Sequence, residues 1–207
     1  MLVNDLVKSG KRLTRTSFEL EREVTFQEHE NYLAVKSESS CVYMAYSKTI
    51  AKPYPEKPSE GCFQILLDKT KKNDILMNFL HRLYVQSKCI ATEELCIKFS
   101  QEVYCINIDI YPVQTDGNLF KLCVEGINRI LKILEIKTFF IPKYQYFCSI
   151  ENCTLADPTE MEIAAANWTV TMVMRSTREL VYFEKAGTEV AQEELALVLN
   201  RVFFAPF

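Results

Sequence analysis

The stretch that most strongly constrains the fold is residues 103–134, VYCINIDIYPVQTDGNLFKLCVEGINRILKIL. Its first part, residues 103–113, is rich in β-branched and aromatic residues, which is typical of a strand. Turn-forming residues 115–118 follow, and Asn118 is suited to cap a helix. Beyond them, one apolar stripe at helical spacing contains Leu119, Leu122, Cys123, Ile127, Ile130, Leu131 and Leu134. A strand that leads into a long amphipathic helix is therefore the centre of the prediction.

The rest of the chain also alternates between strand and helix patterns. Apolar residues at helical spacing predict further helices over residues 1–11, 75–84 and 191–202. Alternating or β-branched segments predict strands over residues 17–26, 32–36, 41–46, 62–67, 94–99, 138–141, 146–150, 168–174 and 179–184. A loop with three prolines, residues 52–61, and a charged turn, residues 69–74, interrupt the pattern. This order predicts an α+β fold.

The composition is typical of a folded domain. Of the 207 residues, 48% are hydrophobic and 25% are charged. The formal net charge of −3 excludes a protein that holds nucleic acid by its overall positive field. No apolar run approaches the ~18 residues of a membrane span, and residues 1–15 lack the continuous apolar core of a secretory signal. We therefore expect a soluble intracellular chain with no membrane contact.

The cysteines and glycines exclude several kinds of site. Eight cysteines are present, mostly among apolar residues, and none of them forms a Cys-x-x-Cys pair. With only His29 and His81 as further ligands, we expect buried reduced thiols and no bound metal. The five glycines are too widely spaced to build a phosphate-binding or dinucleotide-binding loop. We therefore expect no cofactor.

One carboxylate cluster has two interpretations. Asp157, Glu160 and Glu162 offer the oxygen ligands that Mg²⁺ prefers. The neighbouring Pro158 and Thr159 equally suit a turn that is followed by a solvated face. We favour the structural interpretation.

One group of cations is a candidate anion site. Lys69, Lys71 and Lys72 precede the predicted helix that bears Arg82. If the four side chains converge near one end of this helix, they are able to contact phosphates without reading a base sequence. A solvated lysine turn, with Arg82 paired to a carboxylate, explains the same residues equally well.

Several motifs resemble those of the RNase PH-like subunits of the RNA exosome. The most specific match is the central block, which comprises residues 87–97, 103–109 and 115–118. Further matches are residues 11–13, 60–61, 155–162, 169–170 and 187. The resemblance implies a single RNase PH-like domain over residues 1–207, in which two β-rich halves flank central helices. In this arrangement residues 1–15 form an N-terminal lead-in helix.

The resemblance also bears on catalysis. Phosphorolytic members of the family need paired arginines for the attacking phosphate and an aspartate near the scissile bond, because charge on the phosphoryl oxygens must be neutralised in place. Residues 68–74 supply lysines and no arginine pair, and the place of the aspartate falls near Glu151. At the N-terminus, the Asp-Gly-Arg of the family is reduced to Thr14-Arg15. We therefore expect a silent subunit and not an enzyme.

The function implied by the resemblance is that of a non-catalytic ring subunit, which shapes the channel for 3′–5′ RNA processing and decay. The implied partners are other RNase PH-like ring subunits, cap subunits with RNA-binding domains, an associated 3′ exonuclease and single-stranded RNA. Arg82, Lys69, Lys71 and Lys72 are the candidate RNA-binding residues. The implied localisation is nuclear, including the nucleolus, and cytoplasmic. The rival hypotheses are a phosphate-dependent 3′ exoribonuclease and a free-standing RNA-binding scaffold.

Overall fold

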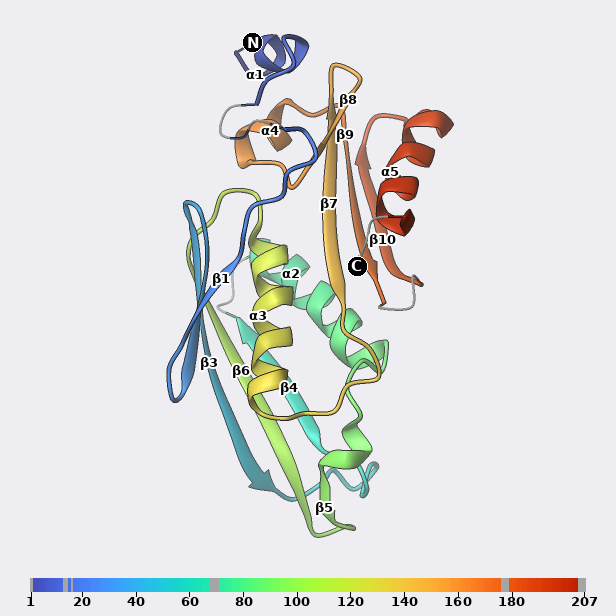
Figure 1. Cartoon of the computed structure of the whole chain (residues 1–207). Helices are drawn as coiled ribbons and strands as arrows, with labels where there is room; N and C mark the ends of the chain where they lie inside the picture. Colours follow the sequence, from blue (N-terminus) through green and yellow to red (C-terminus); the bar gives the residue numbers. More distant parts are fainter. Residues whose placement is uncertain (1, 13–14, 16, 68–70, 176–178, 205–207) are drawn as a thin grey trace. The chain divides into compact units, whose positions relative to one another are not determined.

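The computed structural model of the chain describes residues 2–12, 15, 17–67, 71–175 and 179–204. The chain divides into two compact units that are each formed by segments distant in sequence. Residues 1–23, 116–121 and 143–207 form unit 1, and residues 24–115 and 122–142 form unit 2. Each unit contains one β-sheet (Figure 1). The α+β class is confirmed, whereas the single domain over residues 1–207 stays a prediction.

Unit 2 is built on a six-stranded sheet. Its strands are ordered β1 (Thr25–Glu28), β2 (Tyr32–Ser37), β3 (Ser40–Ala51), β6 (Glu102–Gln114) and β4 (Cys62–Leu67), and β5 (Cys96–Lys98) also pairs with β6. Neighbouring strands are antiparallel except β4 and β6, which are parallel. Parallel neighbours need a crossover connection, and α2 (Lys71–His81) lies in it.

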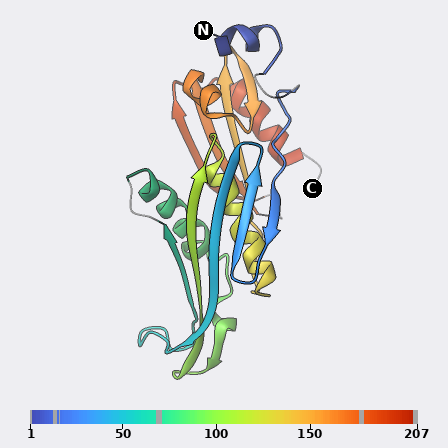
Figure 2. The ribbon, with the colours of Figure 1, turned by 90° about the vertical axis from the view of Figure 1, so that its left-hand side faces the viewer.

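Helices cover one face of this sheet. Both α2 and α3 (Leu119–Ile133), which belongs to unit 2 from residue 122 onward, lie on the same side of the strands (Figures 1 and 2). Gly126 lies so close to the sheet that a Cβ there would be 2.6 Å from Met44 Sδ and 2.9 Å from Val35 Cγ2. The absence of a side chain at Gly126 therefore allows α3 to approach β2 and β3 closely.

Unit 1 contains a four-stranded antiparallel sheet. Its order is β10 (Leu180–Gly187), β9 (Trp168–Met174), β7 (Lys143–Ile150) and β8 (Cys153–Ala156). One core cluster joins β7 and β9 to Val198 and Val202 of α5 (Gln192–Phe204). A second cluster joins Val3 and Val7 of α1 (Leu2–Lys8) to the β7–β8 hairpin. The short helix α4 (Glu160–Ala165) follows β8.

The structure confirms the elements with a clear periodicity and corrects others. Strands β4 and β9 coincide with the predicted residues 62–67 and 168–174, and α3 matches the predicted long helix. Residues 17–24 are irregular where a strand was expected, and residues 138–141 contribute a single bridge, Ile90 to Thr138. The lead-in helix ends at Lys8, well before residue 15. The sequence analysis also missed β8 and α4, which are too short to show a periodicity.

Among the described residues, no helix is both long and apolar enough to cross a membrane.

Candidate functional site

Of the four predicted cations, Arg82 is the one whose side chain the structure describes. Helix α2 begins at Lys71, and Arg82 follows its last residue, His81. At 1.5 Å per residue, the backbones of Lys72 and Arg82 are therefore separated by about 15 Å along the helix. Lys69 and the side chains of Lys71 and Lys72 lie outside the described residues. The convergence of the four cations therefore stays a prediction.

Arg82 is held at the surface by its buried neighbours. It begins a π-helical segment, Arg82–Gln86, in which Arg82 is exposed and the next two residues, Leu83 and Tyr84, are buried. The Tyr84 hydroxyl donates a hydrogen bond to Asn128 Oδ1 at 2.8 Å, and burial raises the pKa of Tyr84 well above its ordinary value. Tyr84 therefore remains a neutral donor that ties this segment to α3, with Arg82 on the outside.

Two acids of the carboxylate cluster, Asp157 and Glu162, belong to a buried network of ion pairs in unit 1. Both oxygens of Asp157 accept hydrogen bonds from Arg22: Arg22 Nη2 lies 2.7 Å from Oδ1, and the Arg22 backbone N lies 2.7 Å from Oδ2. Lys121 Nζ lies 3.4 Å from the same Oδ2. Arg22 is 3% exposed and Asp157 4%, so water scarcely screens the pair.

Glu162 forms the second half of this network. Its carboxylate accepts two hydrogen bonds from Arg12, 2.9 Å from Nε and 2.7 Å from Nη2. It also accepts the backbone N–H of Thr159, whose own side chain accepts the N–H of Glu162 and completes a capping box at the start of α4. Arg15 lies between the two acids, with its guanidinium 3.7 Å from Asp157 and 3.6 Å from Glu162.

The charges of the network set the protonation of its acids. Burial by itself would raise the pKa of Asp157, but the hydrogen bond from Arg22 and the charge of Lys121 outweigh it and hold this pKa below its ordinary value. The pKa of Glu162 is lowered in the same way, against burial, mainly by the hydrogen bond from Arg12. Burial and the neighbouring charge of Arg12 lower the pKa of Arg15. Both acids are therefore ionised and already neutralised by protein cations.

These ion pairs bear on the two interpretations of the acidic cluster, a Mg²⁺ site and a structural turn. Asp157 and Glu162 are buried against guanidinium groups, whereas Glu160 is exposed and uses its backbone N–H to bind Asp116 Oδ1 at 2.9 Å. In the described part of the chain, no group of three or more His, Cys, Asp or Glu residues is arranged to hold a metal ion. Asp157 and Glu162 thus form structural ion pairs, whereas the expected solvated face is wrong for these two residues because both are buried.

The acid expected near the place of a catalytic aspartate also has partners. Glu151 lies in the turn between β7 and β8 at a positive φ of 51°. Its Oε1 accepts a hydrogen bond from Asn4 Nδ2 at 3.1 Å and lies 3.3 Å from Lys8 Nζ. Glu151 therefore binds α1 to the turn of the hairpin.

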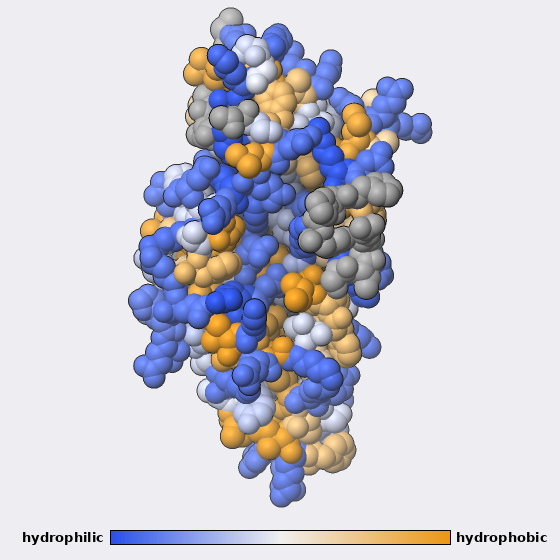
Figure 3. Space-filling view, viewed as in Figure 1, coloured by the Kyte–Doolittle hydropathy of each residue, from blue (hydrophilic) through white to orange (hydrophobic). Residues whose placement is uncertain are grey.

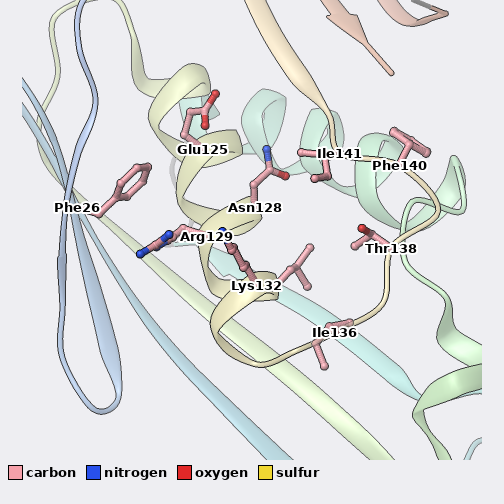
Figure 4. Close-up of a pocket in the computed structure, with 10 residues that line it drawn as sticks. Phe26, Glu125, Asn128, Arg129, Lys132, Ile136, Thr138, Phe140 and Ile141 are labelled. Atoms are coloured by element: carbon pink, nitrogen blue, oxygen red, sulfur yellow. The ribbon is translucent and has the colours of Figure 1, made fainter. Parts of the chain in front are cut away.

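Unit 2 contains a largely apolar pocket with a volume of about 500 Å³. It lies between α3 and the loop that follows, where Ile136, Phe140 and Ile141 form one wall (Figure 4). Arg129 is paired with Glu28, and its guanidinium carbon lies 5.9 Å from the centre of the Phe26 ring. Hydrophobic and charged side chains are interspersed on the corresponding surface (Figure 3).

Two curated proteins are related to the chain in sequence. It is 24% identical over 148 residues to the exosome complex component Rrp42 of Methanopyrus kandleri, which covers 63% of this chain and 55% of that protein. It is 24% identical over 160 residues to the exosome complex component RRP45 of Bos taurus, which covers 64% of this chain and 36% of that protein. The chain thus matches about half of the first relative and about a third of the second. No family model matches.

Solved structures resemble nearly the whole chain. An archaeal exosome core matches with a TM-score of 0.78 at 18% identity, over 96% of this chain and 89% of that chain. The Archaeoglobus fulgidus exosome with RNA bound to the active site matches with a TM-score of 0.77 at 16% identity, over 96% and 91%. Rrp46 of rice, Oryza sativa, matches with a TM-score of 0.74 at 15% identity, over 93% and 92%. The RNase PH-like α+β fold expected from the sequence is confirmed.

Proposed function

We propose that this chain is a non-catalytic ring subunit of an RNA exosome, where it helps to form the channel through which RNA reaches a nuclease. The observation that carries the proposal is that one fold, that of exosome core chains, extends over 96% of the sequence. The proposed partners are related RNase PH-like ring subunits, cap subunits with RNA-binding domains, an associated 3′ exonuclease and single-stranded RNA. The proposed location is the nucleus, including the nucleolus, and the cytoplasm.

Within the ring, we propose the RRP45 type of position, with the protein forty-three and Rrp42 types as alternatives. The motif Ser87-Lys88-Cys89-Ile90, together with Leu95-Cys96, supports this choice through its resemblance. The sequence relatives include both an Rrp42 and an RRP45. Purification of a tagged copy from its own cells tests the ring proposal. A stoichiometric set of five related subunits is expected, whereas a chain that remains alone would support the free-standing scaffold.

The absence of catalysis is supported by the partners of the acidic residues. Asp157 and Glu162 are buried against Arg22 and Arg12, so neither is available to a metal ion. Glu151 is engaged by α1. The sequence of residues 68–74 contains no arginine to bind an attacking phosphate. These features favour a silent subunit over a phosphate-dependent 3′ exoribonuclease.

We expect the purified chain to release no nucleoside diphosphates from single-stranded RNA in the presence of Mg²⁺ and inorganic phosphate. The physical reason is that residues 68–74 provide no arginine pair to neutralise the phosphoryl oxygens. Chromatography of the products measures the reaction, and Glu151→Gln is the matched variant. Phosphate-dependent shortening of the 3′ end that is abolished by Glu151→Gln would establish the enzyme hypothesis instead.

Arg82→Glu is expected to lower the RNA affinity of the assembled complex while it leaves ring assembly intact. Each phosphate neutralised by a cation releases counterions, so the loss should be greatest at low salt and should reduce the salt dependence of binding. Fluorescence anisotropy with single-stranded RNA at several salt concentrations measures the affinity. Size-exclusion chromatography of the same preparation measures assembly.

A charge reversal in unit 1 provides the control for Arg82. Lys185→Glu, on the exposed strand β10, changes the net charge by the same amount and is expected to leave RNA affinity unchanged. If Arg82→Glu disrupts the ring while affinity per intact ring is preserved, Arg82 serves an ion pair within or between subunits and not RNA.

A further inference from the structure

Two cysteines occupy paired positions on adjacent strands of unit 2. Cys62 begins β4, and its register partner in the parallel ladder is Cys105 of β6. Among the described strand pairs, this is the one register pair in which both residues are cysteines. Adjacent strands lie about 4.7–4.9 Å apart. This spacing falls within the Cα separation of about 4.4–6.8 Å that a disulfide spans.

The two thiols also lie on the same face of the sheet. Phe63, the residue after Cys62, contacts the ring of Tyr84 on the face covered by helices, so Cys62 lies on the opposite face. Ile106, the residue after Cys105, is fully buried, which places Cys105 on that opposite face as well. Figure 2 shows this side of the sheet turned toward the viewer, with the helices behind it.

The thiols are register partners, and each has a polar neighbour. Gln64 Nε2 donates to Cys62 Sγ at 3.3 Å, and Cys105 Sγ donates to Asn107 Oδ1 at 3.7 Å. Cys62 is partly exposed, whereas Cys105 is 9% exposed. A small oxidant is thus able to reach Cys62, with Cys105 already beside it.

We propose that Cys62 and Cys105 are a redox-active pair, which a hydroperoxide converts into an intramolecular disulfide that joins β4 to β6. This inference rests on the geometry of unit 2 and is independent of the proposed function in RNA metabolism.

The peroxide accepts the two electrons that the two thiols lose. The sulfur of Cys62 attacks one peroxide oxygen, the O–O bond breaks, and the thiol proton leaves with the other oxygen as water, or as an alcohol for an organic hydroperoxide. The thiol of Cys105 then attacks the sulfur of the Cys62 sulfenic acid. The S–S bond forms, and the S–O bond breaks to release a second water with the proton of Cys105. Two thiols lose two electrons, and one peroxide gains them.

The order of attack follows from exposure. Burial raises the pKa of the Cys105 thiol to about 11, so this thiol is largely protonated near neutral pH and reacts slowly with free oxidant. Cys62 is the more exposed of the two and meets the oxidant first. Cys105, its register partner on the neighbouring strand, then attacks the Cys62 sulfur.

The disulfide would reinforce a weak part of the sheet. β4 forms one edge of the sheet and pairs only with β6 among the described strands. It follows the loop with three prolines. A covalent link at the first residue of β4 therefore ties both the edge strand and the end of this loop to the central strand.

To test the proposal, the folded chain is treated with hydrogen peroxide and the remaining free thiols are then blocked. The chain is digested without reduction, and its peptides are identified by mass. We expect a linked pair of peptides that contain Cys62 and Cys105, the loss of two of the eight free thiols, and full recovery with dithiothreitol. Cys62→Ser and Cys105→Ser should each abolish the linked peptide. Cys153→Ser, which removes another partly exposed thiol, should leave its yield unchanged.

The same peptide map gives the result that would overturn the proposal. If the folded wild-type chain consumes peroxide but yields no Cys62–Cys105 peptide, or yields one only after denaturation, the pair is not redox-active in the native sheet. A folding check by circular dichroism accompanies each variant. The wild-type peptide map, which needs no substitution, remains decisive if a serine variant does not fold.

Discussion

Replacing Asp157 by asparagine is expected to lower the free energy of unfolding by about 3–5 kcal/mol, the usual cost of removing one member of a buried ion pair. Asp157 lies 2.7 Å from Arg22 Nη2 and 3.4 Å from Lys121 Nζ. All three residues are less than 9% exposed. Asparagine keeps the shape of the side chain but removes the buried carboxylate that Arg22 and Lys121 share, so that Arg22 keeps Asp116 at 3.4 Å and Lys121 keeps Glu21 at 2.8 Å.

Urea unfolding followed by circular dichroism measures this loss. Glu94→Gln is the matched control, because Glu94 pairs with Lys137 at the surface, where both side chains are more than half exposed. Exposed pairs of this kind contribute about 0–1 kcal/mol. A loss of less than 1 kcal/mol for Asp157→Asn would show that the buried network is not a major source of stability.

The pH dependence separates charge from packing. The pKa values of Asp157 and Glu162 are depressed in the folded chain, below ordinary values of 3.8 and 4.5. The stability that these acids contribute is therefore fully present above pH 4.5 and is lost as the pH falls through their folded values. We expect the acid-induced loss of stability to be smaller in Asp157→Asn than in the wild-type chain.

Gly61→Ala is expected to lower the free energy of unfolding by about 1–3 kcal/mol, the range for forcing an extra methyl into a packed site. A Cβ at Gly61 would lie 2.2 Å from Leu95 Cβ and 2.7 Å from the backbone oxygen of Tyr104, so it would clash with both atoms. Leu95 is 4% exposed, and Tyr104 belongs to the central strand β6. Neither the Leu95 side chain nor the Tyr104 backbone is therefore able to move away easily. The Gly61 N–H also donates to Thr92 O at 2.8 Å, and this bond should weaken.

Thermal unfolding compared with Ser59→Ala tests this expectation. Ser59 lies in the same loop and is exposed, so its change should stay within about 0.5 kcal/mol. Hydrogen exchange should locate the effect of Gly61→Ala at the start of β4. An unchanged melting temperature would mean that the loop moves aside without cost.

The sequence alone was sufficient to predict the helices and strands whose residue pattern is local. Strand β4 and strand β9 are continuous apolar or β-branched runs, and the stripe of α3 repeats over four turns, so each was predicted with nearly correct ends. Motifs that are continuous in sequence, such as residues 87–97, were also sufficient to predict the RNase PH-like fold. In these cases the deciding residues are close together along the chain.

The tertiary structure decided which distant residues meet. Asp157 and Glu162 were recognised as a carboxylate cluster, but their partners Arg22 and Arg12 are 135 and 150 residues away. Cys62 and Cys105 likewise meet only because β4 and β6 are neighbours, although 43 positions separate them along the chain. An ion pair or a thiol pair depends on distance in space, and no periodicity along the chain records it. The sequence therefore determined the elements and the fold class, whereas the packing of those elements determined which charges and thiols lie together and which are buried.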